Sequence, residues 1–225
     1  MHLKEQILHV EERIQAACTR AERNRSEINI VGVTKYVDLP TTRSLLECGI
    51  QHLGENRWQN ARAKWEDIGD AATWHFIGHL QTNKTKDVVG RFAYIHSLDR
   101  IALLQELDKK AAQMNVLIQA FVQVNVSGEE SKYGLSPDQL FSFVAESKLY
   151  AHVRIVGLMT MAPHEAIPEH TRPVFRGLRM LRDELNERAV IDYSVDHLSM
   201  GMSNDYEIAV EEGSTWLRLG SVLFA

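Results

Sequence analysis

Short apolar runs alternate with amphipathic segments along the whole chain. The apolar runs are rich in β-branched and aromatic residues, which is typical of buried strands. They predict strands over residues 28–34, 50–54, 73–77, 94–96, 118–126, 153–159, 196–199 and 215–219. In the segments between them, apolar positions recur with the helical period. These segments predict helices over residues 39–48, 57–67, 83–89, 100–114, 137–146, 171–187 and 205–211.

An additional helix is predicted before the first strand, over residues 3–23. Its apolar stripe consists of Ile7, Val10, Ile14, Ala17 and Ala21. Eight strands that alternate with helices in 225 residues indicate an α/β fold, a (β/α)8 TIM barrel in which residues 1–225 form a single domain. The alternative is an open doubly wound sheet. The GxGxxG turn that favours this alternative is missing after the first strand, where the sequence reads KYVDLP.

The composition is that of an ordinary globular protein, with 44% hydrophobic and 24% charged residues. The net charge of -5 gives no broad basic field, which argues against nucleic acid as the main partner. No apolar stretch approaches the length of a membrane span, and the charged N-terminus differs from a signal peptide. Cys18 and Cys48 lack CxxC spacing and are expected to be free thiols. We therefore expect a cytoplasmic protein.

Lys35 directly follows the first predicted strand and is the first candidate for chemistry. A buried ammonium is costly unless it is paired or neutralised. One interpretation is a lysine at the barrel mouth whose stem lies on apolar surface while its amine reaches water or a carboxylate. The other is an amine kept near neutral so that it can condense with an aldehyde as a Schiff base. The strand alone leaves both interpretations open.

The segments after the last two predicted strands are suited to a phosphate group, which (β/α)8 barrels often bind at this place. The segment SMGMSND is a small-residue turn into a helix, with hydroxyl groups on Ser199 and Ser203. The segment RLGS offers Gly220 for close backbone approach and Ser221 as a further donor. The alternative interpretation is a capped helix start and a simple turn at the end of the chain.

Barrel closure brings the eighth strand beside the first, so Lys35 and the phosphate segments are expected to be neighbours. A phosphorylated aldehyde satisfies both features, and pyridoxal phosphate is the obvious cofactor of this kind. One role open to Arg218 is then to face the pyridine nitrogen. Because a guanidinium cannot accept a proton, the ring would stay largely unprotonated and act as a weaker electron sink than one paired with a carboxylate.

Six segments resemble one known family, in the same order along nearly the whole chain. They are VTK at 33–35, GENR at 54–57, WHFIGHLQTNK at 74–84, GLMTM at 157–161, LSMGMS at 198–203 and RLG at 218–220. They look like the pyridoxal phosphate homeostasis protein family, which is similar to the N-terminal barrel of alanine racemase. The resemblance implies that Lys35 is the Schiff-base lysine and that Arg218 faces the ring nitrogen. The contacts that it implies around the phosphate and the mouth come from Ser203, Gly220, Ser221, Asn56, His79 and Met159.

The resemblance also implies a function, which is to carry or buffer pyridoxal 5'-phosphate in vitamin B6 homeostasis. Alanine racemase-like enzymes have a second, β-rich domain that supplies a tyrosine base, and racemisation needs bases on both faces of the substrate. The sequence stops with the eighth predicted strand, so we expect no such domain and no enzyme. A weak fold-type III racemase or decarboxylase of amino acids is the alternative. The expected partners are apo forms of pyridoxal phosphate-dependent enzymes, and the expected assembly is a monomer or weak dimer.

Three other features are interpreted as structural. His164 and His170 are six residues apart, which does not fit the histidine spacing of a zinc-binding helix, and no metal site is expected. His75 lies between two aromatic residues of the third strand and is expected to be a buried, hydrogen-bonded barrel histidine. Lys132 follows the fifth strand and is expected to be a solvated surface lysine rather than a second amine for the cofactor.

Overall fold

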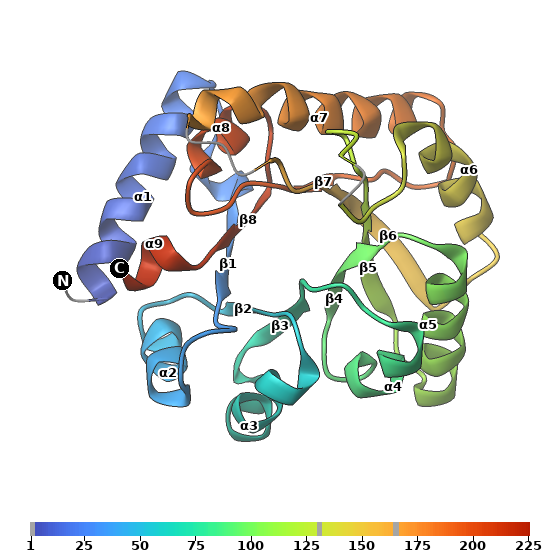
Figure 1. The fold of residues 1–225 in the computed structure, drawn as a ribbon, viewed down its shortest axis with the longest axis horizontal. Helices are drawn as coiled ribbons and strands as arrows, with labels where there is room; N and C mark the ends of the chain where they lie inside the picture. The colour runs from blue at the N-terminus through green and yellow to red at the C-terminus, as the bar shows by residue number, and fades with distance from the viewer. Residues whose placement is uncertain (1–2, 130–131, 164–166) are drawn as a thin grey trace.

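A computed structural model describes residues 3–129, 132–163 and 167–225. Eight parallel strands form a closed barrel in sequence order, which confirms the predicted TIM-barrel fold (Figure 1). The strands are β1 (Asn29–Val33), β2 (His52–Glu55), β3 (Thr73–Phe76), β4 (Tyr94–Leu98), β5 (Ile118–Gln123), β6 (Val153–Met159), β7 (His197–Ser199) and β8 (Trp216–Leu219). The pairs Asn29↔Trp216 to Gly32↔Leu219 join β1 to β8 and close the barrel.

Helices surround the barrel (Figure 1). They are α1 (Leu3–Arg20), α2 (Leu39–Glu47), α3 (Trp58–Ile68), α4 (Thr85–Val88), α5 (Ile101–Met114), α6 (Pro137–Ser147), α7 (Arg172–Glu187), α8 (Tyr206–Glu211) and α9 (Ser221–Phe224). Short 3-10 helices are η1 (Arg25–Glu27), η2 (Gly69–Ala71), η3 (Thr82–Lys84) and η4 (Pro168–Thr171). Every predicted helix is present, but α9 was not predicted.

The extra N-terminal helix, α1, packs outside the barrel against α8 and α9. The Gln6 side chain donates to the carbonyl oxygen of Ala225 at 2.8 Å, so the two ends of the chain lie side by side (Figure 1). The helix ends at Arg20, earlier than predicted, because Glu22 has a φ of 53°, which lies in the left-handed region and outside the α-helix. The apolar stripe of α1 is buried as predicted, apart from the half-buried Ala21 beyond the helix end.

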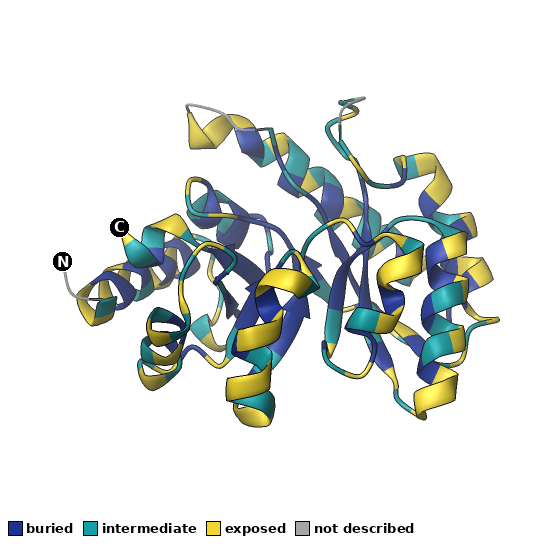
Figure 2. Cartoon of the chain, turned by 60° about the horizontal axis from the view of Figure 1, so that its bottom comes forward, coloured by how far each residue is buried: buried dark blue, intermediate teal, exposed yellow. Residues whose placement is uncertain are grey.

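Buried residues gather on the strands and on the inner sides of the helices (Figure 2). Apolar side chains such as Leu45, Leu53 and Leu107 fill the layer between strands and helices. A second, smaller apolar cluster consists of Val31, Phe121, Met159 and Trp216. The buried polar residues on the strands include His75, His96 and Arg218. The strands therefore carry buried polar side chains in addition to the apolar layer that they share with the helices.

Candidate functional site

Lys35 lies in the turn between β1 and α2, at the carboxyl end of the barrel. The residue is half-buried, and its Nζ lies 5.0 Å from the centroid of the Tyr36 ring, within cation–π distance. Tyr36 is 87% exposed, so the amine lies beside a solvent-facing ring. A ligand that enters from solvent can therefore reach the amine.

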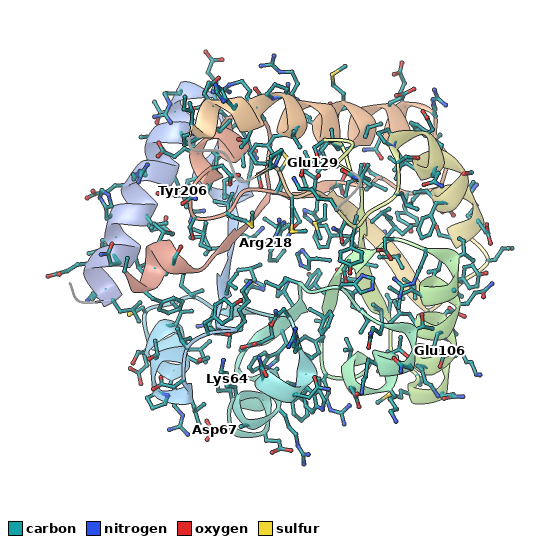
Figure 3. The ribbon with its side chains drawn as sticks, in the orientation of Figure 1. Lys64, Asp67, Glu106, Glu129, Tyr206 and Arg218 are labelled. Atoms are coloured by element: carbon teal, nitrogen blue, oxygen red, sulfur yellow. The ribbon has the colours of Figure 1, made fainter. Side chains whose placement is uncertain are left out.

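A buried ion pair holds the backbone of this turn. Lys64 of α3, labelled in Figure 3, is one partner of this pair. Its ammonium donates to Glu55 Oε1 at 2.8 Å and also to the carbonyl oxygen of Thr34. The Thr34 hydroxyl donates to the same Glu55 oxygen at 2.7 Å. The side chains of Lys64 and Glu55 are only 8% and 0% exposed. The pair fixes the peptide group that precedes Lys35. Lys64 was not among the predicted site residues, although it lies three residues after the buried Ala61, on the same face of the helix.

Arg218 of β8 lies inside the barrel and is 4% exposed (Figure 3). Its guanidinium donates to Ser199 Oγ at 2.6 Å and to the carbonyl oxygen of Thr160 at 3.0 Å. Burial lowers the pKa of Arg218 to about 10, so the residue is a cation at neutral pH. The two hydrogen bonds use part of the donor fork, whose planar geometry suits an acceptor held in a fixed place.

The loops that follow β7 and β8 meet at one hydroxyl group. Ser203 Oγ accepts hydrogen bonds from the backbone N–H groups of Gly220 and Val222, each at 3.3 Å. Backbone amides that converge on one oxygen are an arrangement that also binds anions. Gly220 is adjacent to β1, since a Cβ at this position would lie 3.5 Å from Val33 Cβ. This cradle therefore lies at the end of the strand that leads to Lys35.

The shape of the cradle depends on a neighbouring glycine. Gly201 has a φ of +93°, and a Cβ there would lie 2.5 Å from Ala209 Cβ, so this position requires glycine. At Gly220 an alanine would make only ordinary van der Waals contact, so the obstruction expected there needs a larger side chain. Ser221 begins α9 and is exposed, which keeps it accessible to a ligand. The donors of this region fit a small dianion such as a phosphate group.

Asn56 and His79 lie together on a second part of the mouth. Both line a cavity of about 530 Å³ beside the ends of β2 and β3. The His79 ring stacks on Tyr133 with 4.0 Å between ring centroids, and its Nδ1 lies 3.8 Å from Asp99 Oδ2. Asn56 Oδ1 is a buried atom with no hydrogen-bond partner among the described residues. These two predicted residues thus face a space beside β2 and β3, whereas the cradle lies on the loops after β7 and β8.

Met159 and Ser199 lie deeper than the other predicted site residues. Met159 ends β6 at 1% exposure, within the apolar cluster that contains Val31 and Trp216. Ser199 ends β7 at 0% exposure and bonds to Arg218. Met159 therefore belongs to the buried apolar cluster inside the barrel, and Ser199 accepts a hydrogen bond from Arg218.

Three histidines that sequence analysis did not connect form a hydrogen-bonded row on β2, β3 and β4. His75 is fully buried and hydrogen-bonded, which confirms its structural interpretation. It lies 3.0 Å from His52 and 2.9 Å from His96, and His96 lies 2.8 Å from Ser199 Oγ. Burial is the main cause that lowers the pKa of His75 and His96 well below 6.5, so both are neutral at neutral pH. The signal in the sequence was one histidine on each of three consecutive strands.

The remaining expectations have mixed outcomes. Lys132 is 19% exposed in its side chain and lies 3.2 Å from Glu129 Oε1, so it is an ion-paired lysine and less solvated than expected. Cys18 and Cys48 are free thiols, as expected.

His164 lies outside the described residues. Among the residues that the structure describes, no group of three or more His, Cys, Asp or Glu side chains could hold a metal ion. No helix in the described ranges is long and apolar enough to cross a membrane.

The closed barrel, with the Lys35 turn and the Ser203 cradle at its carboxyl end, is a domain of the alanine racemase type. Residues 9–225 match the family model of the alanine racemase N-terminal domain. An alanine racemase of Clostridium difficile 630 has the same fold, with a TM-score of 0.77 over 99% of this chain and 56% of its own. Its sequence identity is 14%, so this similarity concerns the fold alone.

Closer relatives identify the family. The chain is 43% identical to the pyridoxal phosphate homeostasis protein of Aquifex aeolicus (strain VF5), over 100% of this chain and 98% of that protein. It is 30% identical to PipY of Synechococcus elongatus PCC7942, whose structure with bound pyridoxal phosphate covers 100% of both chains at a TM-score of 0.86. The chain therefore belongs to the pyridoxal phosphate homeostasis protein family, which confirms the resemblance of its motifs.

Proposed function

We propose that this chain binds pyridoxal 5'-phosphate and carries or buffers it in intracellular vitamin B6 homeostasis. Its relative from Aquifex aeolicus is named for this role, and PipY holds the cofactor in its structure. The observation that carries the proposal is that the Ser203 cradle and the buried Arg218 lie on β7, β8 and their loops, next to the strand that leads to Lys35. We also propose that residues 1–225 act as one domain, in the cytoplasm, as a monomer or weak dimer.

The proposed anchor is the Lys35 amine. The cofactor supplies an aldehyde carbon, which a primary amine can attack to form a Schiff base with release of water. The Glu55–Lys64 pair and the Thr34 hydroxyl hold the peptide group before Lys35. They therefore fix the position of the Lys35 backbone, from which the side chain extends toward the cofactor. Half-burial of Lys35 limits its conformations while keeping its end accessible.

The cradle and the arginine bind the two other ends of the cofactor. The N–H groups of Gly220 and Val222, with the hydroxyl groups of Ser203 and Ser221, hold the phosphate. Arg218 donates to the ring nitrogen and, as a cation, offers it no proton acceptor. A ring kept unprotonated is a weak electron sink, which favours storage of the cofactor over chemistry on amino acids. Asn56 and His79 lie at the mouth beside the cofactor, and Met159 lies in the buried apolar cluster beneath it.

A weak racemase or decarboxylase of amino acids is the second candidate, because the fold is shared with alanine racemase. The two functions differ in what happens to an amino acid added to the loaded protein. A carrier leaves the α-proton in place and releases its cofactor to apo-enzymes. An enzyme exchanges the α-proton with deuterated water or releases carbon dioxide.

A spectrum tests the proposal. The protein mixed with pyridoxal phosphate should absorb in the visible range, and borohydride followed by peptide mapping should place the adduct on Lys35. Lys35→Ala should lose the band. Lys132→Ala is the matched control, since it removes a partly buried lysine in the loop after β5, and it should keep the band. A main adduct on Lys132, with Lys35→Ala still coloured, would contradict the proposed anchor.

A further inference from the structure

A continuous hydrogen-bond chain runs from β2 to Arg218. His52 Nδ1 lies 3.0 Å from His75 Nε2, and His75 Nδ1 lies 2.9 Å from His96 Nε2. His96 Nδ1 lies 2.8 Å from Ser199 Oγ, which accepts from Arg218 at 2.6 Å. The members come from β2, β3, β4, β7 and β8, so the chain forms only when the barrel is closed.

The arginine end sets the direction of the chain. A guanidinium has only donors, so Ser199 Oγ accepts from Arg218 and its own proton needs another acceptor. His96 Nδ1 is the acceptor in place, and His96 therefore carries its proton on Nε2. By the same reasoning His96 donates to His75 Nδ1, and His75 donates from Nε2 to His52 Nδ1. All three histidines are then neutral and protonated on Nε2.

The chain keeps this direction only while each imidazole is neutral, because a charged imidazole has no acceptor nitrogen. Burial lowers the pKa of His52, and it is the main cause of the larger lowering at His75 and His96. Ring stacking holds two of the rings in place. His75 stacks on Tyr94 with 4.5 Å between centroids, and His96 stacks on Phe121 at 4.2 Å.

We propose that His96, supported by His75 and His52, is a positioning residue for Arg218. The inference rests on the proposed function and deepens it. Because His96 accepts a hydrogen bond from the Ser199 hydroxyl, the serine oxygen is oriented to accept from Arg218. The hydrogen bonds of Arg218 to Ser199 and to the Thr160 carbonyl together set the plane of the guanidinium. The N–H groups left over are held in one orientation for the ring nitrogen of the cofactor.

The direction can be measured without cofactor. The ¹⁵N chemical shifts of labelled imidazoles distinguish the two neutral tautomers from the charged form, and single His→Gln variants assign the signals. We expect His52, His75 and His96 to be neutral and protonated on Nε2 at neutral pH. A proton on Nδ1 of His96, or a charged His96 or His75, would overturn the proposal.

The positioning role is tested with the cofactor bound. His96→Leu removes the acceptor for Ser199 and should shift the absorbance maximum of bound pyridoxal phosphate and weaken binding roughly tenfold, the loss expected from a loosened charged hydrogen bond. His96→Asn keeps an acceptor near the Nδ1 position and should restore much of both. His197→Asn is the matched control, because His197 is a partly buried histidine of β7 that lies 3.3 Å from Thr215 Oγ1, outside the chain. It should bind as the wild type does.

The outcomes separate the two proposals. If the wild-type protein binds pyridoxal phosphate while His96→Leu and Ser199→Ala keep its spectrum and affinity, the positioning role is wrong and the carrier function stands. If the wild type does not bind pyridoxal phosphate, the carrier function is wrong, and so is the role of the hydrogen-bonded histidines in positioning Arg218 for a cofactor. Ser199→Ala breaks the same link, and it replaces His96→Leu if that variant does not fold.

Discussion

Glu55 and Lys64 form an ion pair inside the protein, 2.8 Å apart, beneath the turn that carries Lys35. Both side chains are buried, and the Lys64 ammonium also donates a hydrogen bond to the carbonyl oxygen of Thr34. A buried pair of this kind is poor grounds for stability by itself, but removing one partner strands the other. The pair links α3 to the end of β1, so the position of the lysine turn depends on a helix that is distant in sequence.

Lys64→Met should lower the free energy of unfolding by about 3–5 kcal/mol, because Glu55 would remain as a buried charge without its partner. Denaturant unfolding followed by circular dichroism measures the change. The matched control is Arg62→Met, since Arg62 pairs with Glu66 on the exposed side of the same helix, at 65% and 53% side-chain exposure. The control should change stability by less than about 1 kcal/mol. Equal effects of the two variants would show that the buried pair is unimportant.

The proposed binding of a phosphate group by the Ser203 cradle predicts a difference between two ligands. Ser203→Ala removes the hydroxyl that bonds to Gly220 and Val222, and Gly220→Val places a branched side chain over these amides. Each variant should weaken pyridoxal phosphate roughly tenfold or more, while pyridoxal, which lacks the phosphate, should bind as it does to the wild type. Titrations followed by absorbance give both affinities, and the exposed Ser142→Ala serves as the control. Equal losses for both ligands would refute a phosphate role.

The barrel was predictable because each strand and helix repeats its own short-range pattern. The strand bounds shifted by a few residues, as at β5, where the predicted strand over 118–126 ends at Gln123. α9 escaped prediction because Ser221–Phe224 is too short to show a helical period. The early end of α1 at Arg20 depends on one left-handed residue, Glu22, which the apolar stripe does not reveal.

The candidate site was only partly predictable, for a physical reason. Ser203 follows strand seven and Arg218 lies within strand eight, near the place where (β/α)8 barrels often bind a phosphate group. Ser199, which bonds to His96, lies 103 residues away along the chain, so no local pattern connects the two. Glu55 precedes Lys64 by only nine residues, but a strand pattern and a helix pattern do not show which of their side chains meet. Helical spacing indicates that Lys64 faces inward, but only the closed barrel shows that Glu55 receives it.

The buried histidines predict how stability changes with pH. His75 and His96 have pKa values lowered from 6.5, so the folded protein keeps them neutral where the unfolded chain is protonated. Their contribution is complete above about pH 6.5 and is lost as the pH falls below that value toward their folded pKa. The slope should be about 1.4 kcal/mol per pH unit for each histidine. Unfolding free energies measured between about pH 6.5 and 5 should show it, and His75→Gln should make the slope shallower. An unchanged slope would mean that His75 is charged in the folded protein.

Arg218 should control the protonation of the bound ring. Arg218→Glu replaces a pure donor with a group that can accept a proton, so the absorbance of bound pyridoxal phosphate should change with ring protonation. Arg218→Gln introduces a neutral side chain, so it separates the effect of a proton acceptor from the effect of losing the positive charge. It also replaces Arg218→Glu if the buried carboxylate prevents folding. A wild-type spectrum in both variants would place Arg218 away from the ring.

The loaded protein should show little or no turnover of amino acids. Arg218 leaves the ring a weak electron sink, and Lys35 is the one base that the proposal places at the aldehyde, whereas racemisation needs a base on each face of the substrate. Incubation with a panel of amino acids in deuterated water, followed by NMR, measures loss of the α-proton, and released carbon dioxide measures decarboxylation. An authentic alanine racemase is the positive control, and Lys35→Ala is the blank. Transfer of the cofactor to an apo-enzyme should be faster than either reaction. Turnover of about 1 per second or more that Lys35→Ala abolishes would restore the enzyme hypothesis.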